Sequence, residues 1–436
     1  MNNKYLFLFA ITTCLNLFAQ NKNNLLIKNI NVINVENGII TKNVNIYIKD
    51  GLIAQIEKDI TKIKLNSTET IVDATGKFLM PGYFDSHVHL PSQSSPFGYK
   101  SYFLANLLNG VTSLRVMRYN PINKLYSDSI SKESLIGPTL YLSQTLTKFT
   151  SYQDMATSFD VYKKDGYTFV KYLWGLSKSQ LDSLAFILKQ KNIPLVGHVH
   201  DGDVAQALKL NYRSIEHAKP IIDLYKKDSL QLFALVPQFA KNNTFYTPGM
   251  HWYYFGWDQI DKQTLYTLPE LNYVPNFLKN YWISEYNKYD SSFIIAKKQQ
   301  YLKEKEEFRV DLKNFDRILR TMEKKNVKFL VGSDEQSFSV PGFTFHREID
   351  HFVNAKITPL SIIKAITINP AECLNVENNI GAIKKGLVAD LVILNANPLE
   401  SATNLNNINA VIKFGHYYTV SQLQELLNKS IANDNK

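Results

Sequence analysis

Between about residues 79 and 385, short apolar runs alternate with segments that have the periodicity of amphipathic helices. This alternation is typical of repeated βα units, in which helices join parallel strands and cover the sheet. Eight units in succession predict a (β/α)8 TIM-like barrel and place the chain in the α/β class. The predicted strands are residues 78–84, 110–115, 139–142, 168–173, 194–199, 213–216, 244–247 and 328–332.

The barrel helices carry their own signals. Ser177 and Gln180 form a capping box, and apolar residues with helical spacing follow them up to Leu188. The stretch from about 258 to 309 is longer than an ordinary barrel connection and rich in Tyr, Phe and Lys. We therefore expect a helical insertion after the seventh strand.

The two ends of the chain have a different sequence pattern from residues 79–385. Residues 25–71 read as short strands separated by turns, and Asp50-Gly51 is a strong hairpin dipeptide. Residues 389–394 form a further predicted strand near the other end. The expected organisation is a barrel of residues 79–385 and a small discontinuous β-sandwich-like domain, built from residues 24–78 and 386–436.

Charge and cysteine content limit the possible partners and metal sites. The chain has 436 residues and a formal net charge of +10, but its lysines are scattered among acidic residues and form no basic stripe with aromatic residues between them. We therefore expect no nucleic-acid partner. Cys14 and Cys373 cannot make a disulfide framework or a thiolate zinc cluster, so His, Asp, Glu or Lys must hold any metal.

The first residues resemble a secretory signal peptide. Lys4 precedes a short apolar run that ends at Phe18-Ala19, and polar residues follow. We expect residues 1–19 to be removed by cleavage near Ala19 and the protein to be exported to the periplasm or the extracellular space. An N-terminal anchor helix is the alternative, although the run is shorter than the ~20 residues that span a bilayer. No other stretch is long enough to span a membrane, and lipidation of Cys14 stays open.

Several predicted strands end in side chains that can bind metal. In a (β/α)8 barrel the carboxyl ends of all strands meet at one face, which is where active sites lie. Two histidines that are two residues apart on a strand point to the same side and can converge on one ion. The candidates in chain order are His87, His89, Lys171, His198, His200, His217 and Asp334.

The sequence of residues 80–89, MPGYFDSHVH, resembles the opening strand of the amidohydrolase superfamily, whose typical form is P-G-x-x-D-x-H-x-H. The resemblance covers roughly residues 25–400 and is closest to the imidazolonepropionase-like and Xaa-Pro dipeptidase-like branch. Two residues depart from the pattern, because Val116 stands where an acid is common and Glu335 where a small residue is common. The other matches are Gly110-Val111-Thr112-Ser113, Lys171, His198-Val199-His200, Ile215-Glu216-His217, Gly332-Ser333-Asp334, Asn369-Pro370-Ala371 and residues 386–392.

The resemblance implies a metal-dependent hydrolase that cleaves an amide or peptide-like C–N bond of a small molecule, without excluding lactones. It implies two divalent ions, zinc by family preference, with a carbamate on Lys171 as their bridge. One ion would bind His87, His89, Lys171 and Asp334, and the other Lys171, His198 and His217. A hydroxide that bridges the ions would be the nucleophile, and Asp334 the general base and acid.

Further residues are expected near the centre or the substrate. In this family the first histidine of the fifth-strand pair is usually the ligand, so His200 is expected beside the centre rather than on the metal. Asp201, Glu335 and His346 are candidates for the surroundings of the centre. The aromatic segment 246–255 follows the seventh strand, and its Trp252 and Tyr253 are expected either to wall an apolar substrate pocket or to pack the insertion onto the barrel.

Two other functions remain open on the sequence. One is a mononuclear deaminase or cyclic-amide ring hydrolase, in which Lys171 is an ordinary lysine and Asp201 moves protons. The other is a catalytically inactive exported binding protein, although such proteins usually lose part of the ligand set, which is complete here. The substrate and the oligomeric state are not determined by these patterns, so an oligomer is possible.

Overall fold

The computed structural model describes residues 24–65, 69–91, 97–147, 159, 161–251, 262–335 and 338–435. The predicted signal peptide lies outside the described residues, and so do Trp252 and Tyr253. Within the described ranges, no helix has the length and apolar character needed to cross a membrane.

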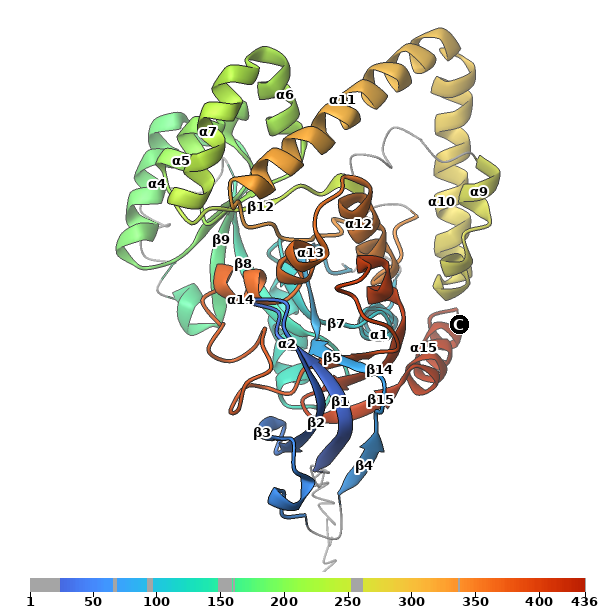
Figure 1. Cartoon of the computed structure of the whole chain (residues 1–436). Coiled ribbons are helices and arrows are strands. Elements are labelled where there is room, and N and C mark those ends of the chain that lie inside the picture. The colour runs from blue at the N-terminus through green and yellow to red at the C-terminus, as the bar shows by residue number, and fades with distance from the viewer. Residues whose placement is uncertain are drawn as a thin grey trace, which may run out of the picture.

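The centre of the molecule is a parallel sheet of seven strands that runs in unbroken chain order from β6 to β12. Figure 1 shows helices α4 to α7 packed together beside its later strands. The predicted α/β barrel class is confirmed. The strands are β6 (Tyr83–Val88), β7 (Val111–Val116), β8 (Thr139–Leu146), β9 (Tyr167–Tyr172), β10 (Leu195–Gly197), β11 (Ser214–Glu216) and β12 (Phe245–Thr247).

The eighth position of the barrel is filled by the closing segment, residues 328–334, which is extended but is not a regular strand. It makes a single isolated bridge, between Phe329 and Tyr246. Backbone hydrogen bonds nevertheless join it to β12 on one side and to β6 on the other, so it completes the ring. They run from Tyr246 N to Lys328 O (3.0 Å), Leu330 N to Tyr246 O (2.9 Å), Ser86 N to Val331 O (2.8 Å) and Asp334 N to His87 O (2.8 Å).

A second sheet contains strands from both ends of the chain, in the order β15-β14-β13-β5-β1-β2-β3, with β4 paired to β1. These eight strands form one hydrogen-bonded sheet at the base of the molecule (Figure 1). The hairpin predicted at Asp50-Gly51 joins β2 to β3. The strands are β1 (Leu25–Ile33), β2 (Ile40–Lys49), β3 (Leu52–Glu57), β4 (Thr70–Asp73), β5 (Phe78–Pro81), β13 (Leu391–Leu394), β14 (Ile408–Lys413) and β15 (His416–Thr419).

The first predicted barrel strand, residues 78–84, is in fact parts of two strands. Pro81 pairs with Leu391 of β13, whereas Tyr83 pairs with Val111 of β7. At Gly82 the chain still donates its N–H to Asp390 O of the second sheet (2.8 Å), and one residue later it has changed partners. The chain therefore passes from the base sheet directly into the strand that carries His87.

The helices cover the barrel, and an insertion follows β12. The capping box at Ser177 begins α4 as predicted. Figure 1 shows α10 and α11 as a helical arm that stands out from the barrel. The helices are α1 (Tyr99–Leu108), α2 (Pro121–Ser131), α4 (Lys178–Gln190), α5 (Val204–Lys209), α6 (Lys219–Lys227), α7 (Ser229–Lys241), α9 (Lys262–Tyr266), α10 (Asn276–Tyr289), α11 (Lys298–Lys324), α12 (Phe343–Asn354), α13 (Pro359–Ala365), α14 (Ile368–Cys373) and α15 (Val420–Asp434).

Candidate metal centre

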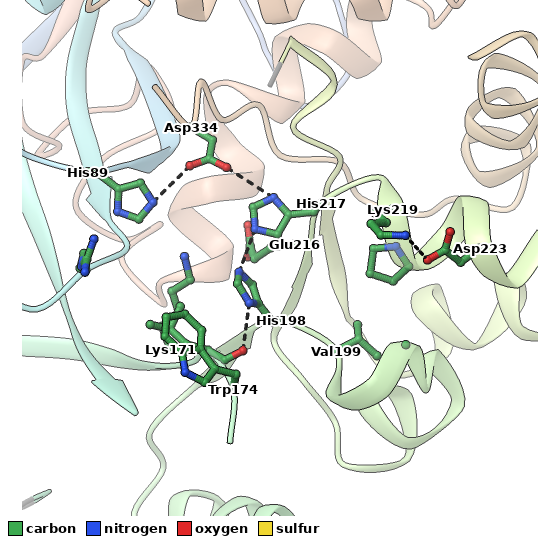
Figure 2. Close-up of a pocket in the computed structure, with 14 residues that line it drawn as sticks. His89, Lys171, Trp174, His198, Val199, Glu216, His217, Lys219, Asp223 and Asp334 are labelled. Atoms are coloured by element: carbon green, nitrogen blue, oxygen red, sulfur yellow. Dashed lines mark hydrogen bonds and ion pairs between the residues drawn. The ribbon is translucent and has the colours of Figure 1, made fainter. Parts of the chain in front are cut away.

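The side chains with metal-binding chemistry gather at the carboxyl ends of the barrel strands. His87 and His89 lie at the end of β6, and Lys171 lies near the end of β9. His198 and His217 are the first residues after β10 and β11. Asp334 ends the closing segment, and Figure 2 shows its carboxylate between the rings of His89 and His217. Because the strands are parallel, residues far apart in sequence meet at this mouth.

Asp334 contacts three of the histidines. Its Oδ1 lies 3.1 Å from His89 Nε2 and 3.6 Å from His87 Nε2, and its Oδ2 lies 3.5 Å from His217 Nδ1. Burial disfavours the charged carboxylate, but the interactions with His87, His89 and His217 outweigh this effect and hold the pKa of Asp334 below its usual range. One ligand atom each from His87, His89 and Asp334 lie within 4.8 Å of one another, which is close enough for one ion.

His87 is held with one nitrogen facing this cluster. Its Nδ1 lies 3.1 Å from Glu216 Oε2, and an ionised carboxylate can only accept, so the proton is on Nδ1. Its Nε2 then presents a lone pair, 3.1 Å from Lys171 Nζ. A histidine whose outer nitrogen donates to a carboxylate is the usual form of a metal ligand.

His198 and His217 make a second pair. The Nδ1 of His198 lies 2.9 Å from the carbonyl oxygen of Leu173 and therefore donates to it. Its Nε2 is left with a lone pair that lies 3.1 Å from His217 Nε2. Burial lowers the pKa of His198 to about 4 and also lowers that of His217, so both rings are neutral. Two neutral ring nitrogens this close fit a shared cation.

Lys171 is the buried base of the centre, with 1% of its surface exposed. Burial lowers its pKa to about 8; Arg115 and Arg118 lower it as well, while Asp334 and Glu216 oppose them. A lysine buried in this way has a much larger neutral fraction than an exposed one. The neutral amine is the form that can capture CO₂ as a carbamate.

A buried ion pair lies behind the ligands, and the sequence patterns did not single it out. Glu216 accepts from Arg115 at 2.8 Å through its other oxygen, and neither residue is exposed. Arg115 also donates to Ser214 Oγ at 2.8 Å. The available signal was a charged residue inside each of two apolar strands, because a buried charge requires a partner.

Gly332 lets the closing segment approach His87. A Cβ at this position would lie 2.5 Å from His87 Cβ and 2.9 Å from His87 N. Asp85 ties the same two segments together, since its Oδ1 accepts from the backbone N–H of Ser333 (3.0 Å) and of His87 (3.2 Å). The spacing between Asp334 and the β6 histidines depends on both residues.

Not all predicted site residues reach the centre. His200 begins a short 3₁₀ turn instead of extending β10, and its Nε2 bonds to Leu176 O at 2.8 Å. The side chain of Asp201 is 88% exposed. His346 is buried on α12, where Nε2 bonds to Asn109 O at 2.9 Å and the ring packs against Tyr83. His346 lines neither cavity beside the centre, because α12 begins at Phe343 and carries it inward.

Two adjoining cavities open beside the ligands, and His89 and Arg118 line both. The first lobe, of about 490 Å³, is also lined by Lys171, Trp174, His198 and His217. The second lobe, of about 510 Å³, is also lined by Tyr102, Asn123, Trp282, Glu335 and Ser339. Trp174 is an aromatic wall of the first lobe, while the predicted wall residues Trp252 and Tyr253 lie outside the described residues.

Comparisons with known proteins agree with this geometry. The sequence model of the amidohydrolase family matches residues 78–417. A dihydroorotase of Methanosphaera stadtmanae is 25% identical over 402 residues, which is 85% of this chain and 87% of that protein. An adenine deaminase of Listeria welshimeri is 36% identical over 97 residues, which is 22% of this chain and 15% of that protein.

Solved structures show the same fold. A Xaa-Pro dipeptidase with methionine bound in its active site has a TM-score of 0.66 at 18% identity, covering 91% of this chain and 100% of that one. A bottromycin amidohydrolase has a TM-score of 0.69 at 18% identity, covering 94% and 90%. The family match confirms the predicted superfamily, and the solved structures confirm the fold. With this match over most of its length and a His-His-Asp cluster at the barrel mouth, the protein is a hydrolase of C–N bonds that belongs to the amidohydrolase family.

Proposed function

We propose that the protein hydrolyses an amide-type C–N bond of a small molecule at a centre of two divalent ions, which we take to be zinc. His87, His89, Lys171 and Asp334 would hold one ion, and Lys171, His198 and His217 the other, with Lys171 as a carbamate. The observation that carries this proposal is the inward direction of the nitrogen lone pairs. Glu216 and the carbonyl oxygen of Leu173 accept hydrogen bonds from the Nδ1–H groups of His87 and His198, which leaves both Nε2 atoms facing the centre.

A residue of the chain would transfer the proton from the attacking water to the leaving group. When bound, the metal would act as a Lewis acid and lower the pKa of water from 15.7 to about 7. Asp334 takes the proton that the attacking water loses and delivers it to the leaving nitrogen, so that an amide and water give an acid and an amine. Its contacts with His89 and His217 orient both carboxylate oxygens for this transfer.

The first lobe supports a small substrate with an apolar part. Leu173, Trp174, Val199 and Pro220 line it beside the ligands. The indole of Trp174 is 54% exposed, so a substrate that covers it gains hydrophobic contact at little structural cost.

The mononuclear alternative receives less support from the geometry. It needs Asp201 to move protons at the reacting atoms, and that side chain is almost fully exposed and lines neither lobe. We therefore assign proton transfer to Asp334 alone.

The test is Lys171→Ala. Wild-type protein should contain about two zinc ions per chain by elemental analysis. The variant should lose most metal and at least about 100-fold in kcat/KM, and short-chain carboxylic acids should restore part of the activity by replacing the bridging carboxylate. Lys384→Ala, at an exposed lysine in the chain between α14 and β13, is the control and should match wild type. Full activity and full metal content in Lys171→Ala would exclude the binuclear centre.

We also propose that the protein is exported and cleaved near Ala19, on the basis of the N-terminal pattern. Sequencing the N-terminus of protein recovered from the native envelope or medium tests this. A mature chain that begins close to Gln20 is expected, and a chain that retains Met1 in the cytosol would contradict it.

A further inference from the structure

Arg118 is a positive charge at the place where the two lobes meet. It lines both lobes, and its side chain is exposed. Within the described residues its guanidinium group makes no hydrogen bond or ion pair, whereas Arg115 of the same segment is neutralised by Glu216. An arginine stays protonated in proteins, so this charge does not depend on its surroundings. The charge of Arg118 is therefore available to an anion that enters the mouth.

The backbone around Arg118 is fixed by side chains from two neighbouring elements. Asn123 Nδ2, on α2, donates to the carbonyl oxygen of Arg118 at 3.1 Å. The backbone N–H of Tyr119 donates to Thr145 Oγ1, on β8, at 2.7 Å. The guanidinium group thus extends from a backbone that is already ordered, which reduces the conformational entropy that is lost when a ligand binds it.

The second lobe, beside Arg118, contains buried polar atoms that lack partners. Asn123 is 3% exposed and Ser339 is 4% exposed, yet Asn123 Oδ1 and Ser339 Oγ have no hydrogen-bond partner among the residues that the structure describes. Such atoms are normally satisfied by a ligand or by water. Glu335, the acidic residue of this lobe, accepts from the hydroxyl of Tyr102 at 2.6 Å and makes no ion pair with Arg118. The second lobe therefore offers a polar ligand one unpaired cation and neutral hydrogen-bonding atoms.

The first lobe has an apolar lining instead. Leu173, Trp174 and Val199 line it, and His89 of the centre lines both lobes. A molecule whose reacting bond lies at the centre can therefore place an apolar group against Trp174 and a charged group against Arg118. The planar fork of a guanidinium group matches the two oxygens of a carboxylate and can donate two parallel hydrogen bonds to them.

We propose that Arg118 is a specificity-determining residue that binds a carboxylate of the substrate. The enzyme then prefers amides that have an apolar group on one side of the scissile bond and a free carboxylate on the other. Amino acids that carry an apolar N-acyl group are the simplest members of this class. This inference rests on the proposed hydrolysis of a C–N bond. A neutral carboxamide in place of the carboxylate leaves the charge of Arg118 without a partner and binds less tightly.

The first test measures binding without hydrolysis. The probes 4-phenylbutanoate and 4-phenylbutan-1-ol share a phenyl group and a chain length, and neither has a C–N bond to cleave. Calorimetry on the purified full-length enzyme should give a Kd about tenfold lower for the acid. In Arg118→Met the two Kd values should agree within about twofold, because the methionine is apolar and uncharged. Equal Kd values in wild type would overturn the proposal. A preference for the acid that persists in Arg118→Met would also overturn it, because the carboxylate would then bind elsewhere, for example on the metal.

The second test measures the release of benzoate from N-benzoyl-alanine and N-benzoyl-alaninamide by the zinc-loaded enzyme. The ratio of kcat/KM for the two should favour the free acid about tenfold in wild type. In Arg118→Met the ratio should approach one, with the carboxamide rate and the metal content nearly unchanged. Arg118→Lys should give an intermediate ratio, because it keeps the charge and loses the fork. Arg309→Met, at an exposed arginine of α11 that lines neither lobe, is the matched control and should keep the wild-type ratio.

The two tests separate the two claims. A preference for the acid in binding that is lost in Arg118→Met, with no hydrolysis of any amide, would reject the proposed function and retain the carboxylate site. Equal kcat/KM values for both amides in wild type, or a ratio unchanged by Arg118→Met, would retain the function and reject the carboxylate site. Loss of metal and of activity on both amides alike in Arg118→Met would assign Arg118 to the metal centre and would also reject the carboxylate site.

Discussion

At the scale of single residues, the ligands depend on the charges packed behind them. Arg115 neutralises Glu216, and Glu216 in turn fixes the ring of His87. Without Arg115, the fully buried carboxylate of Glu216 would have no compensating positive charge. Without Glu216, the buried guanidinium of Arg115 would have no compensating negative charge. The metal binding proposed for His87 is therefore coupled to Glu216, which lines the first lobe, and to Arg115, which lines neither lobe.

Glu216→Gln should weaken metal binding. Glutamine replaces one of the two carboxylate oxygens by an amide nitrogen. This nitrogen is a donor and would face the N–H donor of either Arg115 or His87. We expect metal affinity to fall about 10–100-fold in a chelator competition, with the fold retained by circular dichroism. Asp201→Asn, at an exposed acid, should behave as wild type. An unchanged affinity in Glu216→Gln would show that His87 is oriented by packing alone.

The histidine pair after β10 gives a second prediction. His198→Ala should lose about half of the bound metal, because His198 Nε2 faces His217 in the centre. His200→Ala should retain the metal, because His200 Nε2 is bonded to the carbonyl of Leu176. Elemental analysis of both purified variants decides between them. Metal loss in His200→Ala with retention in His198→Ala would reverse the assignment.

At the scale of secondary-structure elements, α12 is fastened to the segment after β12 by one carboxylate. Glu348 accepts from the backbone N–H groups of Met250 (2.9 Å) and His251 (2.6 Å). Burial raises the pKa of Glu348 to about 8, although these hydrogen bonds oppose the shift. The folded protein thus holds this proton more tightly than the unfolded chain, in which the pKa is near 4.5.

This difference predicts a pH-dependent stability. The contribution of Glu348 to the free energy of unfolding is complete below about pH 4.5 and is lost as the pH rises to about 8. Glu348→Gln is neutral throughout and lacks this contribution. The Tm of wild type minus that of the variant should therefore be largest near pH 5 and should shrink towards pH 8. A Tm difference that is constant over this range would contradict the raised pKa.

Elements with local signals were predictable from the sequence, and those defined by distant partners were not. The capping box at Ser177 specifies α4 within four residues, and Asp50-Gly51 specifies its hairpin in the same way. The closing segment has the composition of a strand, but the backbone N–H of Ser333 donates to the side chain of Asp85, about 250 residues earlier in the chain. The change of partners at Gly82 likewise depends on Asp390.

The candidate site follows the same division. Histidines at strand ends could be found from residue type and spacing, because the barrel itself brings strand ends together. Arg115, Arg118 and Trp174 carried no such signal, since their importance comes from which residues they face across the barrel. The spacing of the two histidines also does not reveal that β10 ends before them and that a 3₁₀ turn begins at His200. This turn directs His200 away from His198.

At the scale of the whole molecule, a buried ion pair joins the base sheet to the barrel. Lys413 of β14 contacts Asp390 Oδ2 at 2.5 Å, and it also donates to Thr139 Oγ1 (2.6 Å) and Thr112 O (3.1 Å) of the barrel. Lys413 is 3% exposed and Asp390 is 1% exposed. The ammonium group of Lys413 therefore donates hydrogen bonds to acceptors of the base sheet and of the barrel at the same time.

Lys413→Met should destabilise the protein strongly. The methionine fills the space, but it leaves the charge of Asp390 buried and unpaired, which costs about 3–5 kcal/mol of the free energy of unfolding. Denaturant unfolding measures the loss. Lys384→Met breaks an ion pair with Glu36 in which both side chains are about half exposed, and it should cost less than about 1 kcal/mol. Similar losses in both variants would mean that the buried pair contributes no more than a surface one.

The mixed origin of the base sheet has a consequence for synthesis. β5 leaves the ribosome early, yet its neighbour β13 is translated roughly 300 residues later, which takes about 15–60 s at ordinary elongation rates. During that interval the nascent chain holds β1 and β5 with an unpaired edge beside β5. The strand that carries His87 continues directly from β5. Until β13 has emerged, β5 is paired on its β1 side alone, so the support beneath the candidate metal site is incomplete. The candidate metal centre is therefore expected to gain this support only after translation has passed β13.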